Sequence, residues 1–204
     1  MTTLAIAPNR TQEKKAASRE RILKEAAAAI RLDGTERVSV QSVMKRAGMT
    51  VGGFYAHFES KDDLLAQAIA EMFAERYAWF LARLDGPDPA GTLSRFVDNY
   101  LSMRHREAVE HGCPIPALSG EIGRLPDAVR VQFVIGMDRL TDAVDQLLCR
   151  LSHPNPQAAA SSAVAEMTGA IGLARVQPDP EKAAALLLAS RIRVRDRLGL
   201  GAAD

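Results

Sequence analysis

The stretch VSVQSVMKRAGMTVGGFYAHFESKDDLLAQAIA, residues 38–70, decides the fold. Ser39 is suited to cap a short helix that ends at Gly48, because its hydroxyl can accept a bond from a first-turn N–H and glycine suits a left-handed stop. A second short helix follows over 51–57, and a much longer one opens near Ser60. Two short helices joined through a glycine turn and held by an earlier helix predict a helix-turn-helix, whose second helix enters the major groove of DNA.

The chain on either side of this stretch also favours helix, since apolar residues recur at spacings of three and four. The first helix is expected from Ser18 to Asp33, with Gly34 as its stop, after a flexible polar arm over 1–15. The long helix should run to GPDP at 86–89, and further breakers separate four or five more helices: Gly112 to Pro116, Pro126, His153 to Pro156 and Gln177 to Pro180. These elements predict an all-α fold of about nine helices.

The net charge of +1 conceals two opposite halves. Residues 1–61 carry eleven Lys and Arg against six Asp and Glu, a net charge of +5, whereas residues 62–204 carry a net charge of −4. A basic head is what a surface that binds phosphate needs, although charge divisions of this size also arise by chance.

Composition excludes several classes of protein. Among 204 residues, 47% are apolar and 25% are charged, which excludes fibrous and strongly disordered chains. Two cysteines are too few for a secreted scaffold held by disulfides, and the N-terminus lacks the basic region of a signal peptide. No apolar run approaches the roughly 20 residues that span a bilayer. We therefore expect a cytoplasmic protein with no membrane partner.

The second short helix carries Gly52 and Gly53, which cost about 1 kcal/mol each in a helix. Such glycines are tolerable where one backbone must approach another closely. Tyr55 and His57 can offer polar groups to phosphate, and Lys61 lies at the start of the long helix, where N–H groups also favour an anion. Phe54 and Phe58, four residues apart, are expected in the core of the head instead.

Residues Ser18 to Ile69 resemble the DNA-binding domain of the TetR/AcrR family of bacterial repressors, through RERILKEAAAAI, AGMTVGGFYAHF and KDDLL. The resemblance implies that Ser39 contacts a phosphate and that Gln41 reaches a base edge. It also implies that the positions facing the groove are Thr50, Val51, Gly52 and Gly53. The positions that bind phosphates would be Tyr55, His57 and Lys61. Since the two glycines carry no side chain, base readout would depend on Gln41, Thr50 and Val51. Lys45 either touches DNA or lies on a solvated face.

The resemblance further implies two domains, a helix-turn-helix domain over 16–62 and an effector-binding and dimerisation domain over 63–204. Nine of the ten aromatic residues lie between Phe54 and Tyr100. An aromatic cavity between helices is a common ligand site, although for each residue taken singly a place in the core is favoured. The candidate pocket residues are Phe73, Tyr77, Phe80, Phe96, Tyr100, Cys113 and Phe133, and the expected ligand is a small apolar or aromatic effector.

The segment HGCPIPALSGEIG, residues 111–123, resembles a GCP-type stretch that lies near the effector cavity in part of the family. Cys113 could be a sensing thiol activated by His105 or His111, or an inert buried cysteine. The remote alternative is an enzyme with Cys113 as nucleophile, but the chain lacks an orienting third group and any cofactor motif. The scattered histidines and cysteines lack metal-ligand spacing, so we expect neither metal nor cofactor.

The last two helices are interpreted as a dimer interface, because small residues on one side allow close helix approach and the final helix carries apolar faces. The interface candidates are Ala165, Gly169, Gly172, Leu187 and Val194. The sequence thus predicts a transcriptional regulator and not an enzyme: a homodimeric repressor that binds a palindromic operator and is released by a ligand. The alternatives are an activator and a redox-sensing regulator that uses Cys113.

Overall fold

The computed structural model describes residues 10–201. Within them the chain forms nine α-helices, three short 3-10 helices and no strand, so the all-α prediction is confirmed. No helix among these residues combines the length and the apolar character needed to cross a bilayer.

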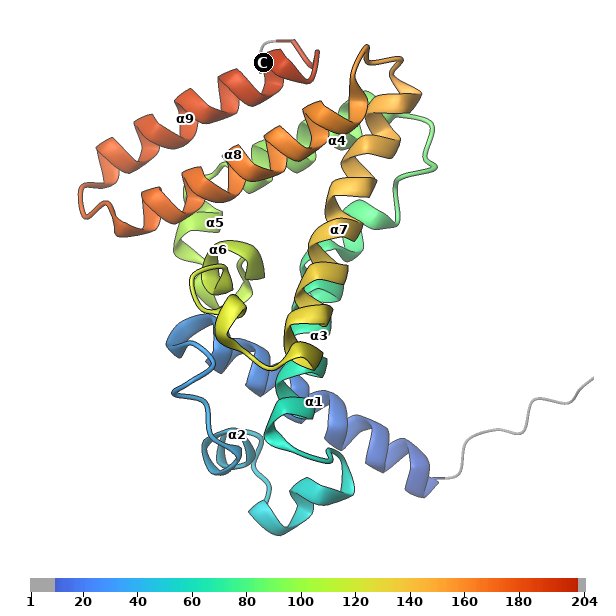
Figure 1. Cartoon of the computed structure of the whole chain (residues 1–204), viewed down its shortest axis with the longest axis vertical. Coiled ribbons are helices and arrows are strands. Elements are labelled where there is room, and N and C mark those ends of the chain that lie inside the picture. Colours follow the sequence, from blue (N-terminus) through green and yellow to red (C-terminus); the bar gives the residue numbers. More distant parts are fainter. Residues whose placement is uncertain (1–9, 202–204) are drawn as a thin grey trace, which may run out of the picture.

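The head is built from α1 (Arg10–Asp33), α2 (Val40–Arg46), the 3-10 helix η1 (Val51–Ala56) and the start of α3 (Lys61–Leu81), at the bottom of Figure 1. Helix α1 begins at Arg10 and not at Ser18, so the expected arm is wrong for residues 10–15; residues 1–9 lie outside the described part. These residues are exposed, and they are helical because Gln, Glu, Lys and Ala favour helix without any packing.

The turn of the head follows the predicted caps. Ser39 forms a reciprocal capping box with Ser42, and Gly34 and Gly48 have φ of +78° and +69°, the left-handed geometry that glycine suits. The second helix differs from an ordinary α-helix, since residues 51–56 form a 3-10 helix. Gly52 explains the difference in part, because glycine weakens an α-helix.

The body is organised around α3 and α7, which pack along each other (Figure 1). Gly136 of α7 lies directly against Phe73 of α3, and a Cβ at that position would overlap the aromatic ring. Helix α3 ends at Leu81, before the GPDP stretch, and Arg150 then binds the carbonyls of Leu84 and Gly86. The other elements are α4 (Pro89–Tyr100), α5 (Met103–Glu107), η2 (Val109–His111), α6 (Pro114–Leu118), η3 (Ile122–Arg124), α7 (Asp127–Arg150), α8 (Pro156–Val176) and α9 (Pro180–Arg197).

Proline opens most of the later helices, as the breaker pattern predicts. Pro89, Pro114, Pro156 and Pro180 each lie in the first turn of a helix, where the missing N–H has no partner to lose. Helices α8 and α9 form a pair that packs side by side (Figure 1). Buried Arg195 ties α9 to α4, because its Nη1 donates to Asp98 at 2.8 Å.

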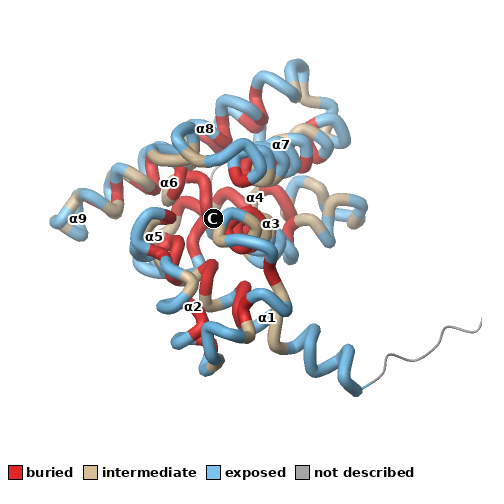
Figure 2. Tube along the Cα trace, turned by 60° about the horizontal axis from the view of Figure 1, so that its bottom comes forward, coloured by how far each residue is buried: buried red, intermediate tan, exposed pale blue. Residues whose placement is uncertain are grey.

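Burial concentrates where helices face one another, as Figure 2 shows for α1, α3 and α8. The N-terminal part of α1 and much of α9 are exposed instead. The core of the head joins that of the body through α3, since Leu64 and Ile69 at its N-terminal end and Phe80 near its C-terminal end are all buried. Helix α3 therefore contributes to the core of both parts of the molecule.

Candidate functional site

The residues expected to bind DNA lie on the outer side of the head, and its core lies beneath them. Phe54 and Phe58 are only 1% and 2% exposed and stack with ring centroids 5.5 Å apart, which confirms them as core. The exposed positions are Ser39, Gln41, Lys45, Thr50, Val51, Gly52 and Tyr55, and the partly exposed ones are Gly53, His57 and Lys61. Tyr55 is 76% exposed and Val51 46%, so two large side chains face solvent where a partner would bury them.

Neither glycine of η1 is required by the fold. Gly52 and Gly53 do not adopt a positive φ, and a Cβ at Gly52 would have no neighbour within 4 Å. The nearest atom to a Cβ at Gly53 would be the Met44 methyl group, at 3.9 Å. Alanine would therefore fit both positions in the free protein, so the fold itself does not require glycine there.

The basic side chains of the head differ in whether they form ion pairs within the protein. Arg46 Nε pairs with Glu25 at 3.1 Å and so ties α2 to α1, whereas Lys45 makes no ion pair with any described residue. At the start of α3, the Ser60 hydroxyl already accepts the Asp63 N–H, and Asp62 and Asp63 add negative charge to the first turn. Binding of a phosphate at this place would therefore depend on the Lys61 ammonium group and not on the N–H groups at the N-terminus of α3.

His57 is held as a neutral side chain in the free protein. Partial burial, together with the positive charges of Lys15 and Arg19, lowers the pKa of His57 below 6.5. Its Nδ1 atom is buried without a hydrogen-bond partner. A phosphate contact from His57 would therefore come from its other nitrogen.

A cavity of about 650 Å³ lies in the body between α3, α4 and the α5–η2 segment. Aromatic rings form one side of it: Phe80 and Phe96 stack with centroids 4.1 Å apart, and Phe96 meets Tyr77 edge-on at 6.1 Å. Its lining residues are Arg76, Tyr77, Trp79, Phe80, Phe96, Asn99, Ser102, Arg104, His105, Ala108 and His111.

The structure separates the predicted pocket residues into three groups. Tyr77, Phe80 and Phe96 line this cavity. Phe73 lines a second cavity of about 430 Å³ between α1, α3 and α7, which Tyr77 also reaches. Tyr100, Cys113 and Phe133 line neither cavity, because they are buried in the packing behind the walls.

Cys113 belongs to a buried network and not to a reactive pair. The Tyr77 hydroxyl donates to Cys113 Sγ at 2.8 Å, and the thiol is 0% exposed. Burial raises the pKa of Cys113, although hydrogen bonds from Tyr100 and Tyr77 counter part of that effect. A raised pKa disfavours the thiolate, which is the nucleophilic form.

His105 does not activate the thiol, because both of its ring nitrogens are engaged elsewhere. The backbone N–H of Cys113 donates to Nε2 at 3.0 Å, so the proton resides on Nδ1 and is donated to the Tyr100 carbonyl at 2.8 Å. Burial lowers the pKa of His105 to about 3. His111 is exposed and pairs with Glu75 at 3.8 Å, so neither histidine acts as the base for Cys113.

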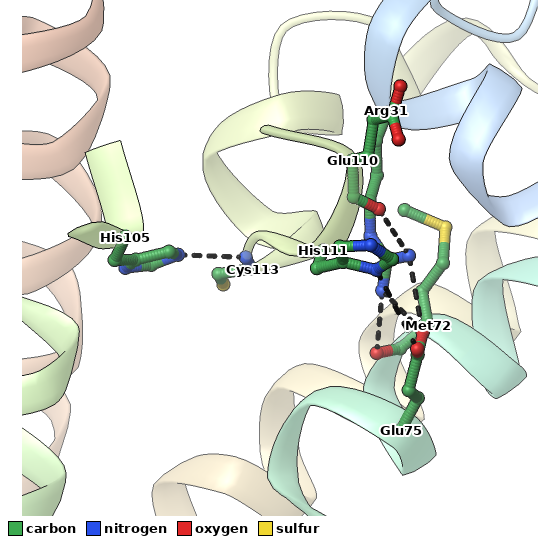
Figure 3. A network of polar contacts seen from close by, with 7 residues as sticks. All are labelled: Arg31, Met72, Glu75, His105, Glu110, His111 and Cys113. Atoms are coloured by element: carbon green, nitrogen blue, oxygen red, sulfur yellow. Dashed lines mark hydrogen bonds and ion pairs between the residues drawn. The ribbon is translucent and has the colours of Figure 1, made fainter. Parts of the chain in front are cut away.

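The wall of the first cavity also holds the head. Buried Arg31 of α1 donates to the Glu110 carbonyl of η2 at 2.9 Å, to the Met72 carbonyl at 3.2 Å and to the Glu75 carboxylate at 3.4 Å. Figure 3 shows this network and, from the same α5–α6 stretch, the hydrogen bond between Cys113 and His105.

A second polar contact lies beside the first. The Thr35 N–H and hydroxyl, just after α1, donate to the Glu121 carboxylate at 3.1 and 3.0 Å. Thr35 is only 1% exposed, so these bonds are largely shielded from water. The head is therefore attached to the body on both sides of α6.

Comparison with known proteins supports the arrangement of head and body. Residues 22–68 match a family described as "Bacterial regulatory proteins, tetR family". A helix-turn-helix transcriptional regulator of Mycobacterium tuberculosis is 30% identical over 169 residues, covering 79% of this chain and 86% of the relative. The chain belongs to the TetR family. It is therefore a DNA-binding transcriptional regulator, in agreement with the resemblance of its head.

One further relative and one solved structure are similar to this chain. The transcriptional repressor DhaR of a Mycobacterium species is 29% identical over 96 residues, which cover 47% of this chain and 48% of DhaR. The reduced form of Escherichia coli NemR superposes with a TM-score of 0.76, covering 88% of this chain and 97% of NemR. At 18% identity, that likeness extends to the TetR-type fold alone.

The predicted interface of this TetR-family chain needs revision. Leu187 and Val194 are 2% and 0% exposed within one chain, so they belong to its own core and cannot meet a partner. Ala165 and Gly169 are exposed and Gly172 partly so. The large apolar side chains that face solvent on α8 and α9 are Leu173, Val176, Leu188 and Ile192, which are 47–76% exposed.

Sequence reasoning missed several residues that shape this regulator's cavity. Arg76 lies four residues before Phe80, a spacing that places both side chains on one face of a helix and could have indicated Arg76 from the sequence. Arg104 and Ser102 carry no such signal, because they reach the cavity only through the fold of α5. Arg31 and Glu121 likewise meet through tertiary structure.

The buried His105 predicts that the stability of the protein falls in acid. Its pKa is about 3 in the folded chain and 6.5 when free, so the unfolded state binds the proton first and stability is lost as pH falls below 6.5. We expect a loss of about 2 kcal/mol from this group between pH 7 and pH 5, measured by urea unfolding.

His105→Gln keeps a donor and an acceptor but does not titrate, so its stability should change less over the same interval. His153→Gln, in the turn between α7 and α8, is the matched control and should retain the full pH dependence. Equal acid sensitivity of the His105 variant and the unaltered protein would contradict a neutral, buried imidazole.

Proposed function

We propose that this protein is a homodimeric repressor that binds a palindromic operator and is released when a small molecule enters the cavity between α3, α4 and α5. One observation carries the proposal. The α5–η2 segment lines the cavity through Ala108 and His111 and holds α1 through the bond from Arg31 to Glu110. A ligand that displaces this wall would disturb the attachment of the head.

The mechanism needs only two states with different affinities. If the effector binds better to a conformation in which the heads are differently spaced, it lowers the affinity for DNA by the same coupling free energy. Two recognition helices of a dimer must reach successive major grooves, about 34 Å apart. A small change in the angle of α1 and α3 is therefore enough to spoil the match.

The division of labour follows the predicted domains. We assign residues 16–62 to DNA binding and residues 63–204 to effector binding and dimerisation. In the head, Ser39, Tyr55, His57 and Lys61 would hold phosphates. Gln41, Thr50 and Val51 would read bases, and Gly52 and Gly53 would allow close approach. Lys45 is exposed and makes no ion pair within residues 10–201, which favours a phosphate contact over a structural role. Such a regulator works in the cytoplasm, where the chromosome is.

The alternatives differ in support. An activator would use the same DNA contacts, and the partial relative DhaR, which is a repressor, favours repression. A redox role for Cys113 has less support, because the thiol is buried with a raised pKa. A reporter gene placed behind the operator separates activation from repression, since deletion of the regulator lowers expression in one case and raises it in the other.

Binding to the DNA that flanks its own gene tests the proposal directly. We expect a specific gel shift, and Lys61→Ala should weaken binding to all sequences alike and reduce the salt slope by about 1, because it removes one phosphate contact. Lys182→Ala, in the first turn of α9, is the control and should leave binding unchanged. No specific shift at any salt concentration would refute the proposal.

Gly52→Ala tests whether the backbone of η1 approaches DNA. The open space around this glycine predicts a change in unfolding free energy within about 0.5 kcal/mol. The added methyl group should nevertheless reduce operator affinity about tenfold or more, since it occupies space at the interface. Gly120→Ala, which also has open space, is the control outside the head. Undiminished affinity of Gly52→Ala would show that this backbone stays away from the groove.

The exposed apolar stripe on α8 and α9 predicts where the dimer forms. Ile192→Glu places a charge on a side chain that is 57% exposed in one chain, so folding should persist while the dimer dissociates. Val131→Glu, on α7 and 50% exposed, is the matched control and should remain dimeric in analytical ultracentrifugation. If Val131→Glu dissociates and Ile192→Glu does not, the interface lies on α7.

A further inference from the structure

The first cavity is positively charged as well as aromatic. Among its described lining residues, none is acidic, whereas Arg76 and Arg104 both line it. Outside the lining, Arg83 lies over the ring of Trp79, a lining residue, with its Cζ 4.6 Å from the ring centroid. Such a lining favours a ligand of opposite charge.

Arg76 differs from Arg106 and Arg175, which lie nearby, because no described residue pairs with it. It makes no hydrogen bond or ion pair with any described residue, and its Nε atom is buried without a partner. The guanidinium lies 5.9 Å from the centroid of the Tyr77 ring, on the wall of the cavity. Arg76 is partly exposed, and its buried Nε lacks a hydrogen-bond acceptor, so an anion at this place would gain a charge-assisted hydrogen bond.

Neighbouring arginines show the contrast. Arg106 Nε donates to the Ala174 carbonyl at 2.7 Å, and Arg175 Nη2 donates to the His105 carbonyl at 3.3 Å. Both guanidinium groups are therefore engaged in fastening α5 to α8. Arg76 and Arg104 have no such task, and Arg104 is exposed.

The histidines of the cavity do not alter this balance. His105 is neutral, since its Nε2 accepts a backbone N–H and its pKa is about 3. His111 faces Glu75 at 3.8 Å, a carboxylate that also accepts from Arg31. The charge open to a ligand is thus that of Arg76 and Arg104.

We propose that the effector of this regulator is an organic carboxylate, with its anionic group on Arg76 and Arg104 and an apolar body against Tyr77, Phe80 and Phe96. Guanidinium groups bind carboxylates in a two-pronged geometry, and the stacked rings provide the apolar surface. The volume of about 650 Å³ suits a ligand of drug-like size. This inference rests on the proposed function, which assigns the effector to this cavity.

The test compares acids with their uncharged amides. Titration calorimetry of the full chain uses three probes, 4-phenylbutyrate, 2-naphthoate and decanoate, each paired with its primary amide. At least one acid should bind about tenfold or more tightly than its amide, as expected for a charge-assisted hydrogen bond. Trp79, the sole tryptophan, lines the cavity, so its fluorescence reports binding at this place.

Two substitutions locate the anion. Arg76→Gln should abolish the preference for the acid and leave amide affinity unchanged, and the exposed Arg104→Gln should reduce the preference without any risk to folding. Arg139→Gln is the matched control, because Arg139 is exposed and lines the second cavity. Loss of acid binding in Arg139→Gln but not in Arg76→Gln would overturn the assignment.

The remaining outcomes separate this inference from the proposed function. If every amide binds as tightly as its acid, or if no acid binds, the carboxylate proposal fails while operator binding can still be observed by gel shift. If acids bind through Arg76 but no operator is bound, the anion site stands and the repressor proposal fails. Release of the operator by the acid, and not by its amide, would support both.

Discussion

The buried guanidinium of Arg31 is the interaction on which the relation between head and body depends. A cation shielded from water is tolerated only while its hydrogen-bond acceptors stay in place. Those acceptors come from two elements outside α1: Met72 and Glu75 belong to α3, and Glu110 belongs to η2. The three elements are thereby fixed relative to one another. A shift of η2 must either move α1 with it or leave a buried charge unsatisfied.

The second constraint is that α3 serves two cores at once. Its N-terminal end packs inside the head, and its later turns carry Tyr77 and Phe80 into the wall of the cavity. Gly136 lets α7 approach Phe73 so closely that α3 has little freedom to slide. The aromatic lining, the attachment of the head and the position of η1 are therefore mechanically linked through one helix.

What the sequence predicts correctly here is mostly local. Gly34, Gly48, Ser39 and the prolines act through their own backbone geometry, so the helix boundaries they set could be read without any tertiary structure. The outward face of the head could be inferred for the same reason, together with the family resemblance. Apolar periodicity is less informative, because it shows which face of a helix is apolar but not whether that face packs inside the chain or against another molecule. Leu187 was thus assigned to an interface although it is core, and Leu188 next to it is exposed.

The charge in the cavity was beyond the reach of sequence reasoning, because it depends on which arginines remain unpaired after folding. Arg106 and Arg175 look no different from Arg76 in the sequence, yet carbonyls of α8 and α5 engage both of them. Typical couplings between two sites amount to about 1–3 kcal/mol, and one hydrogen bond to a charged group contributes a similar amount. In the mechanism proposed above, a coupling of that size would correspond to a change in DNA affinity of about tenfold. Such a mechanism would need no large rearrangement of the body, only a ligand large enough to displace η2 from α1.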